Sequence, residues 1–444
     1  MNVAVMKTKA EQGLLEAFDA VSGKLPGGAA VMARRAEAIG RFGALGLPHR
    51  RIEEWKYTDL RSSLKQALPP AIDDRTPVTI AELIVALGPL AHLDAYRVAF
   101  VNGQHRGVLD DFGEASGLEV RALAADLTAA PEKLAPGLID PSEYDGAITA
   151  LNTAFVTDGA IVRVGDGVRL AKPLLVIFVR AGREAQAVAV RNVLSIGAGA
   201  DATLIEAHVV LPGACQEAQV NSRSEVSVGK GAAVRHAKVA VDSGRTVHLS
   251  NWDIWLDAEA AYRGFQFTMG QGLARNGIRI GFGGEGGKLD LSGAYLVRGQ
   301  EHVDTTLVVD HAVPGCESRE LFKGVLDGQG RGVFQGKIIV RPDAQKTDGK
   351  QMSQALMLSE DAEFDSKPEL EIFADDVVCG HGTTSAELDP DLLFYCKSRG
   401  IPESEARALM IESFIGEAID KVEDASLRAA LMAYTKGWLA GSTR

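Results

Sequence analysis

Apolar and polar residues alternate at every second position through the middle of the chain, from about residue 146 to about 376. Glu225–Val228 and Lys288–Leu291 are typical segments, and each is short and bounded by small residues. A period of two predicts strands that bury one face. Because we find no ten-residue helical stretch between these strands, β–α–β crossovers are not expected. The pattern predicts an all-β middle region.

Small or acidic four-residue turns recur between these strands. They begin at Gly197, Gly229, Asp257, Gly284, Gly328 and Ser359, with one longer interval between Gly284 and Gly328. A loose repeat in a glycine-rich β segment favours a solenoid, in which each turn packs only on its neighbours. We therefore expect a β-helix, and a large sandwich or barrel is the alternative that the pattern leaves open.

Residues 1 to about 145 mix helical and strand patterns. Helices are predicted over Glu11–Val21 and Ala29–Phe42, the second ending at Gly43. Arg97–Val101, followed by Asn102-Gly103, predicts a strand that enters a hairpin turn. Three prolines, at positions 131, 136 and 141, predict a linking region before the β-rich part.

The chain from about residue 385 is predicted to be helical. Asp389-Pro390 is typical of a helix start, because proline at the first turn gives up no hydrogen bond. Two further helices carry wide apolar stripes, one through Ile411 and Ile415 and the other through Leu431 and Trp438. We thus expect three parts, residues 1–145, 146–384 and 385–444. Deletion of the last part is expected to leave the β-rich core folded.

Composition narrows the function classes. The 444 residues include 47 basic and 59 acidic side chains, a balance that argues against binding to nucleic acids or anionic membranes. The longest strongly apolar run, Leu174–Val179, is too short to span a membrane, and Met1–Ala10 lacks the apolar segment of a secretion signal. The four cysteines form no CxxC pair and are expected to be reduced. These features predict a cytoplasmic protein.

Two glycine-containing motifs fail as nucleotide sites. Gly281–Gly286 fits the G-x-G-x-x-G pattern, but a predicted strand follows it in place of the helix that would hold the pyrophosphate. Gly336-Lys337 is followed by Ile338, where a Walker A motif requires Ser or Thr. We expect the chain to bind neither NAD nor ATP.

Cys379 and His381 are the strongest candidates for chemistry. Side chains two apart on a strand point to the same face, and a thiolate and an imidazole are good ligands for iron or zinc. Two ligands cannot close a metal site, so another segment or a partner would have to supply the rest. A structural pair, with a buried cysteine and a hydrogen-bonded histidine, is the alternative. A nucleophilic Cys379 is the weakest of the three interpretations.

Other polar residues carry weaker signals. Cys316 could reach a metal, and four residues nearby could serve as ligands: His302, Asp304, Asp310 and His311. Polar turns of a solenoid give the same pattern. The segment Arg51–Thr58 is dense in charge and contains Trp55 and Tyr57, which we interpret as aromatic packing at a helix start.

Several segments resemble the SufB/SufD family of iron–sulfur cluster assembly proteins. They are Ser318–Gly324, Gly332–Lys337, Ala344–Thr347, Ser366–Ile372, Ala374–Gly382 and Leu393–Ile401. The resemblance is strong from about 300 to 420 and weaker elsewhere. Glu53–Thr58 (Glu-Glu-Trp-Lys-Tyr-Thr) resembles the SufD branch of the family.

The resemblance implies a right-handed parallel β-helix between an N-terminal helical or mixed region and a C-terminal helical domain. It implies a non-catalytic scaffold subunit that pairs with SufB at the β-helix edge and binds the ATPase SufC through the C-terminal helices. For that contact we expect Leu392, Phe394, Tyr395 and Phe414. His381, with Cys379, would contribute to a nascent iron–sulfur cluster shared with SufB, whereas no scaffold role is transferred to Cys316 or Cys396.

Two other functions stay open at this point. One is a SufB-like principal scaffold, and the other is a β-helix enzyme acting on carbohydrates, which would need paired acid–base carboxylates in a groove. Flavin binding, the type of cluster, the iron donor and a homodimer of the isolated protein are not decided by the sequence.

Overall fold

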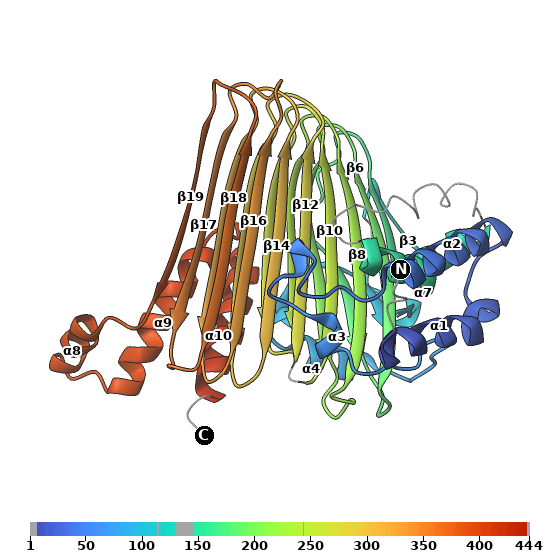
Figure 1. The fold of residues 1–444 in the computed structure, drawn as a ribbon, viewed down its shortest axis with the longest axis horizontal. Helices are drawn as coiled ribbons and strands as arrows, with labels where there is room; N and C mark the ends of the chain where they lie inside the picture. Colours follow the sequence, from blue (N-terminus) through green and yellow to red (C-terminus); the bar gives the residue numbers. More distant parts are fainter. Residues whose placement is uncertain (1–6, 113–114, 130–145, 243, 442–444) are drawn as a thin grey trace, which may run out of the picture.

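Two parallel sheets wind into a solenoid of about eight turns, which forms the body of the molecule (Figure 1). The computed structural model describes residues 7–112, 115–129, 146–242 and 244–441. One sheet contains the odd-numbered strands β5 Leu174–Arg180, β7 Asp201–Val210, β9 Ala233–Val241, β11 Ala261–Met269, β13 Lys288–Val297, β15 Glu317–Leu326, β17 Asp348–Met357 and β19 Val378–Ala386. The other contains the even-numbered strands β4 Ala160–Val164, β6 Gln186–Ile196, β8 Ala218–Val228, β10 Val247–Leu256, β12 Leu273–Phe282, β14 His302–His311, β16 Arg331–Val340 and β18 Glu363–Ile372. The predicted β-helix is confirmed.

Each turn of the solenoid repeats one corner, where the chain passes from the even-numbered to the odd-numbered sheet. One residue there has positive φ, and the equivalent residues are Gly199, Gly231, Glu259, Gly286, Gly315 and Lys346. Their N–H groups bond to the next turn, as from Gly199 N to Lys230 O at 2.8 Å. Four of the six predicted turns lie at this corner, but those at Gly328 and Ser359 lie at the opposite corner.

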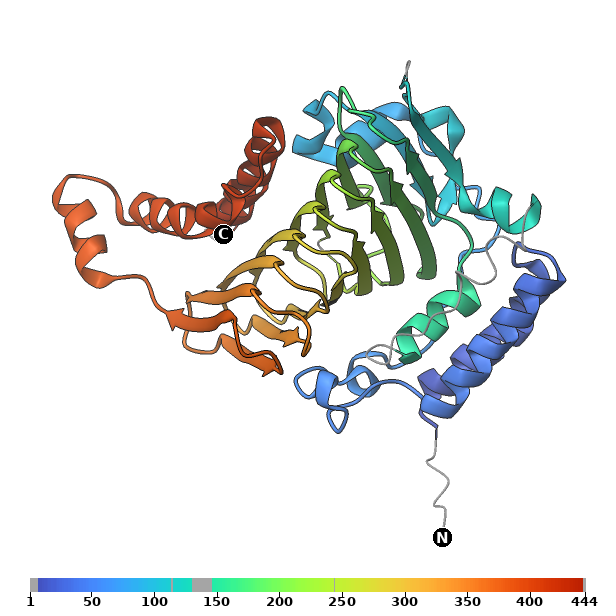
Figure 2. The ribbon, with the colours of Figure 1, turned by 90° about the horizontal axis from the view of Figure 1, so that it is seen from above.

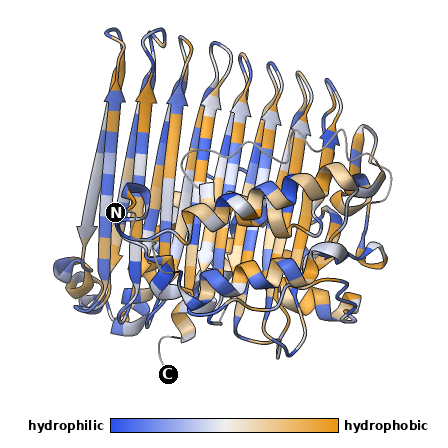
Figure 3. Cartoon of the chain, turned by 45° about the vertical axis from the view of Figure 1, so that its right-hand side comes forward, coloured by the Kyte–Doolittle hydropathy of each residue, from blue (hydrophilic) through white to orange (hydrophobic). Residues whose placement is uncertain are grey.

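The inward-facing side chains form the main core. Residues at every second position of both sheets point inward and pack together, among them Leu204, Val226, Ile280 and Phe334. The outward positions alternate with them, which gives the mixed polar and apolar banding along the strands in Figure 3. The alternation that predicted the strands is therefore the alternation between the inside and the outside of the solenoid.

The N-terminal region adds strands as well as helices. Its elements are α1 Lys9–Val21, α2 Ala29–Leu45, α3 Leu60–Ser63, α4 Ile80–Leu87, β1 Tyr96–Val101, β2 Gln104–His105, β3 Leu118–Ala122 and α5 Leu123–Ala129, with short 3₁₀ turns at Ser22–Lys24, Glu53–Trp55, Gly88–His92 and Gly107–Leu109. The predicted helix end at Gly43 is wrong. The helix continues to Leu45, and Gly46 with φ 70° ends it. The three prolines at 131, 136 and 141 lie outside the described residues.

Antiparallel strands close the solenoid at its N-terminal end. The predicted hairpin is confirmed, because Asn102 and Gly103 both have positive φ and join β1 to β2. β1 also extends the odd-numbered sheet by pairing with β5, and β3 pairs antiparallel with β4 at the edge of the other sheet. Hence the N-terminal region supplies the cap of the solenoid.

Helices cover the two outer faces of the solenoid on opposite sides (Figure 2). Helix α7, Gly146–Phe155, is buried between α2 and strands β6 and β8, so a helix opens the region that the pattern predicted as all β. On the other face α9 Glu403–Ile419 and α10 Ala425–Gly441 place Ile411, Ile415, Leu431 and Trp438 against the odd-numbered sheet. Helix α8, Pro390–Ser398, precedes them and projects from the solenoid (Figure 1). None of the described helices is long and apolar enough to cross a membrane.

Candidate functional site

The C-terminal end of the solenoid is open. Strands β18 and β19 are the last strands of their sheets, and within the described residues no strand pairs with their outer edges. Every residue in the two strands is at least partly exposed, whereas most residues in the preceding turns are buried. We call this end of the solenoid, formed by β17, β18 and β19, the mouth.

Cys379 and His381 both face into the mouth. They pair in register with Gly349 and Gln351 of β17, which occupy buried inward positions. Cys379 is half-buried and packs against an apolar cluster that includes Ile338 and Val340, whereas His381 is exposed. Burial raises the pKa of the Cys379 thiol, and the nearby Asp348 and Glu320 carboxyls act in the same direction. The structure therefore places the two candidate ligands on the same side, as expected for i and i+2 on a strand.

Three hydroxyl groups join both sheets beside these residues. Ser353 lies 2.9 Å from Ser366 and 2.7 Å from Thr383, and Ser366 lies 2.7 Å from Thr383. The three residues come from β17, β18 and β19, so the hydroxyl cluster fixes the last turn of the solenoid across the interior. It gives the mouth a polar lining.

Two buried polar side chains lie directly behind the mouth. Glu320 of β15 pairs in register with Gln351, and Gln351 pairs with His381. Both are 3% exposed. Within the described part of the chain, no donor meets hydrogen-bond geometry with either oxygen of Glu320, although the nearby Ser318 hydroxyl partly opposes the rise in the Glu320 pKa, and the amide oxygen of Gln351 has no partner. Burial raises the pKa of Glu320 to about 8. Glu320 was missed in the sequence, because only the register of three strands brings it near His381.

The weaker metal candidates do not gather into a site. Cys316 lies in the core with its Sγ 3.6 Å from the Gly284 carbonyl oxygen. His302 and His311 lie at opposite ends of β14, where the rings approach the hydroxyls of Thr58, at 3.3 Å, and Ser318, at 3.1 Å. Asp304 accepts a bond from Arg275 at 2.6 Å, and Asp310 pairs with Arg341 at 2.7 Å. Among the residues that the structure describes, no three His, Cys, Asp or Glu side chains come together as metal ligands.

The segment around Trp55 anchors the N-terminal region to the outside of the solenoid. Trp55 is buried, and the Arg275 guanidinium lies 3.9 Å from its ring centroid. The Glu54 carbonyl accepts bonds from Arg275 at 2.8 Å and from Gln335 at 3.1 Å. Trp55 therefore has the packing role that the sequence predicted for it.

Helix α8 presents an apolar surface. Leu392, Phe394 and Tyr395 are 48%, 73% and 53% exposed, and Cys396 on the same helix is half-buried. Phe414 differs from these three, because it lies on α9, packs partly against the solenoid and has the Lys323 ammonium 4.4 Å from its ring centroid. The structure thus brings together three of the four predicted contact residues.

A second polar group lies deep inside the solenoid and was not anticipated. His236 bonds to Glu206 and to Tyr262, both at 2.8 Å, and Ser224 donates to Glu206 at 2.8 Å. Burial opposes ionisation of Glu206, but these bonds, with His236 first, outweigh it and lower the pKa to about 2. Nearby, burial lowers the pKa of Lys238 to about 7. The signal in the sequence is a polar residue at an inward strand position.

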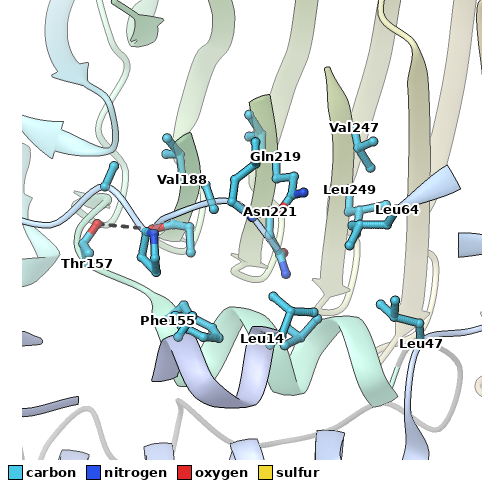
Figure 4. Close-up of a pocket in the computed structure, with 18 residues that line it drawn as sticks. Leu14, Leu47, Leu64, Phe155, Thr157, Val188, Gln219, Asn221, Val247 and Leu249 are labelled. Carbon is cyan, nitrogen blue, oxygen red and sulfur yellow. Dashed lines mark hydrogen bonds between the residues drawn. The ribbon is translucent and has the colours of Figure 1, made fainter. Parts of the chain in front are cut away.

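A small apolar cavity lies between the N-terminal helices and the even-numbered sheet (Figure 4). Its volume is about 70 Å³, and Leu14, Phe155, Val188 and Leu249 are among the residues that line it. It contacts β6, β8 and β10, whereas the mouth is formed by β17, β18 and β19. The cavity is therefore separate from Cys379 and His381.

Comparison with known proteins supports the resemblance. The family model of the SufBD core domain, of the SUF system for FeS cluster assembly, matches residues 178–414, and the model of the SufBD N-terminal region matches residues 9–176. The iron–sulfur cluster assembly protein SufD of Escherichia coli is 31% identical over 402 residues, which cover 90% of this chain and 91% of the relative. A SufBD family protein of Synechocystis is 30% identical over 408 residues, 90% and 89% of the two chains. SufD of Bacillus subtilis is 30% identical over 285 residues, 62% and 63% of the two chains.

The solenoid, its helical flanks and these matches define the class of protein: the chain belongs to the SufBD family of iron–sulfur cluster assembly proteins. Within the family it is most like SufD, and the similarity extends over nearly the whole chain. The family resemblance inferred from the sequence is confirmed, and with it a role in iron–sulfur cluster assembly.

Proposed function

We propose that the chain is a non-catalytic subunit of a cluster assembly scaffold, and that its mouth meets a SufB partner. The observation that supports this most directly is the orientation of Cys379 and His381, which face the interior at the C-terminal end of the solenoid, where β18 and β19 have unpaired outer edges within the described residues. An open edge is a template for pairing with another chain. A second solenoid docked there would continue both sheets and enclose the two side chains.

The nascent cluster would be cargo that the two chains hold together. A thiolate and a neutral imidazole bind iron, but a closed site needs about four ligands. Cys379 and His381 supply two, and within the described residues no third candidate ligand joins them. A partner that contributes the remaining ligands makes assembly of the site depend on assembly of the complex.

The ATPase SufC would bind to α8. Its exposed side chains Leu392, Phe394 and Tyr395 lie on a helix that contacts α9 and projects from the solenoid. Large exposed apolar residues on such an arm are typical of a protein contact. Phe414, expected in the same contact, packs partly against the solenoid and would lie at its margin.

Substitution of His381 by Ala tests the role of the mouth. Because His381 is exposed, its loss should change stability by no more than about 1 kcal/mol, and the complex with SufB and SufC should remain intact on gel filtration. Iron and acid-labile sulfide in the reconstituted complex should fall sharply, with a smaller loss for Cys379→Ala. His92→Ala, at another exposed histidine, is the matched control. Normal cluster content in the His381 variant, or dissociation of its complex, would contradict the proposal.

A further inference from the structure

The two edge strands of the mouth differ in charge. Every outward-facing side chain of β18 is charged, namely Glu363, Asp365, Lys367, Glu369 and Glu371. β19 ends the other sheet beside it (Figure 1) and contains no Asp, Glu, Lys or Arg; its outward positions are Val378, Gly380, Gly382, Thr384 and Ala386. Charged side chains protect a sheet edge from pairing with another chain, whereas an uncharged, flat edge strand favours such pairing.

The backbone of β18 is also interrupted at its open edge. Its odd-numbered residues bond to β16, since Glu363 N donates to Gly330 O at 3.1 Å. At the other end of the strand Phe373 N donates to Val340 O at 2.9 Å. The register between the strands has no break, so the even-numbered residues of β18 direct their N–H and C=O groups to the open side. Pro368 is one of these residues, and it has no N–H to offer to a further strand.

The open edge of β19 has no such interruption. Val378 N donates to Thr347 O at 2.9 Å, and the register with β17 continues without a break as far as Ala386. The odd-numbered residues therefore direct their N–H and C=O groups to the open side. They are Cys379, His381, Thr383 and Ser385, and none is proline. The two candidate ligands thus lie on residues whose backbone groups face the position of a further strand.

We propose that β19 is the strand with which SufB pairs, and that Pro368 and the charged side chains protect β18 from pairing. This inference rests on the proposed contact between the mouth and SufB, and it names the edge that carries that contact. The partner's other sheet would lie beside β18 without a continuous ladder of hydrogen bonds.

The position of the candidate ligands favours a SufB strand as the occupant of this edge. Side chains on the same face of two paired strands lie about 5 Å apart. A strand paired with β19 would therefore bring its own side chains next to Cys379 and His381. A strand paired with β18 would lie beside Ser366 and Leu370, on the opposite sheet, and facing sheets are about 10 Å apart. Of the two edges, β19 is the one at which two chains can complete one metal site.

Hydrogen exchange measured by mass spectrometry tests which strand is paired. On addition of SufB, peptides spanning residues 378–386 should gain protection at the amides of Cys379, His381, Thr383 and Ser385. Peptides spanning residues 363–372 should exchange as they do in the free chain. If the complex forms and the new protection lies on β18, or on neither strand, the inference is overturned. Protection of β19 that rises with the concentration of the chain alone, and that SufB does not change, would assign the edge to a second copy and overturn the choice of partner.

Substitutions at Ser385 separate the role of the N–H from that of the side chain. Ser385 is exposed, and Ser385→Pro removes one N–H from the open edge, whereas Ser385→Ala removes the same hydroxyl and keeps the N–H. Affinity for SufB should fall about tenfold for Ser385→Pro, the effect of about one backbone hydrogen bond. Ser385→Ala should bind like the wild type, and so should Pro368→Ala, which restores an N–H to the edge of β18. Equal affinity of the two Ser385 variants, or tighter binding by Pro368→Ala, contradicts the choice of β19.

The exchange measurement uses the wild type, so it decides the question even if Ser385→Pro unfolds. Failure of this inference is also distinct from failure of the proposed function. If no complex with SufB forms, the proposed function fails. If the complex forms and its cluster depends on His381 while the β19 amides still exchange freely, only the choice of pairing strand is wrong.

Discussion

Glu320 and Lys238 both face the interior of the solenoid, and burial moves their pKa values toward neutrality from opposite sides. The pKa of Glu320 rises from 4.5 to about 8, and that of Lys238 falls from 10.5 to about 7. Each residue is therefore neutral in the folded chain over a pH range in which it would be charged in the unfolded chain. Folding stability must depend on pH through both groups, with opposite signs.

In the wild type, Glu320 should make the free energy of unfolding fall as pH rises, and the Glu320→Gln variant should lack this fall. Between about pH 4.5 and about 8 the folded state keeps the Glu320 proton and the unfolded state has lost it, so stability falls as pH rises. One group with this shift changes the free energy of unfolding by about 1.4 kcal/mol per pH unit. From about pH 5 to about pH 7 the variant should gain about 2–3 kcal/mol on the wild type in urea unfolding.

The control for this prediction is Glu317→Gln, which removes an exposed carboxyl of the same strand. The Lys238 contribution lies mainly between about pH 7 and 10.5 and has the opposite sign, so it leaves the comparison below pH 7 nearly unaffected. Identical pH profiles for wild type and Glu320→Gln would show that Glu320 is ionised in the folded chain.

Residues of the site differ in how far the sequence could reveal them. Cys379 and His381 are two apart on one strand, so their common orientation follows from local geometry. Glu320 meets Gln351 and His381 only through the register of β15, β17 and β19, with about a full turn of chain between neighbours. No local pattern fixes that register, because the corners between the strands determine it.

At the scale of elements, local signals predicted most strands and helices but confused the two corners of the solenoid. The longer interval between the turns at Gly284 and Gly328 arises because the former lies at one corner and the latter at the other. Glu259 and Lys346 occupy left-handed corner positions where other turns have glycine, so a search for glycine could not find the true repeat. Helix α7 was missed because its residues are buried on all sides and show no polar face.

Helix α7 is held by a buried arginine, which leads to a prediction about helix packing. Arg35 of α2 is 1% exposed and donates to the carbonyl oxygens of Thr153, Ala154, Val156 and Pro26 at 2.8–3.3 Å. Arg35→Ala would leave these acceptors without a donor and should cost about 3 kcal/mol of stability in thermal or urea unfolding. Arg34→Ala, which removes only an exposed pair with Glu37, should cost less than about 0.5 kcal/mol.

A second element-scale prediction concerns α8. Phe394→Ser should weaken the affinity for SufC by about thirtyfold and so reduce its copurification. A large exposed aromatic side chain at the centre of a contact contributes about 2 kcal/mol to binding. Circular dichroism should be unchanged, since Phe394 is 73% exposed. Val85→Ser, at a 62% exposed residue of α4, is the matched control and should bind SufC normally. Equal binding by the two variants would remove α8 from the proposed contact.

At the scale of the whole molecule, the C-terminal helices are part of the core. Ile411, Ile415, Leu427 and Leu431 pack with outward-facing residues of the odd-numbered sheet such as Phe267. The expectation that residues 385–444 could be deleted without harm to the β-rich core conflicts with this packing. The amphipathic stripes were evident in the sequence, but the surface that they cover required the fold.

Two deletions separate the roles of these helices. Removal of residues 388–444 uncovers the apolar outer face of the odd-numbered sheet and should give an aggregating protein in size-exclusion chromatography. Replacement of residues 389–400 by a flexible linker removes only α8 and should leave a folded monomer-sized core that no longer copurifies SufC. If the first deletion gives a folded protein that elutes as a single monomer-sized peak, α9 and α10 are dispensable for folding.

The positions of the capped end and the open end along the chain also suggest the order in which the solenoid folds during synthesis. The capping hairpin and the first turns leave the ribosome early, and each finished turn offers an unpaired strand edge on which the next can form. The last turn, with Cys379 and His381, is completed only when some 60 residues remain to be made. Helices α9 and α10 then emerge and cover the exposed sheet behind it. The unpaired outer edges of β18 and β19 are thus the last strand edges of the solenoid to be made.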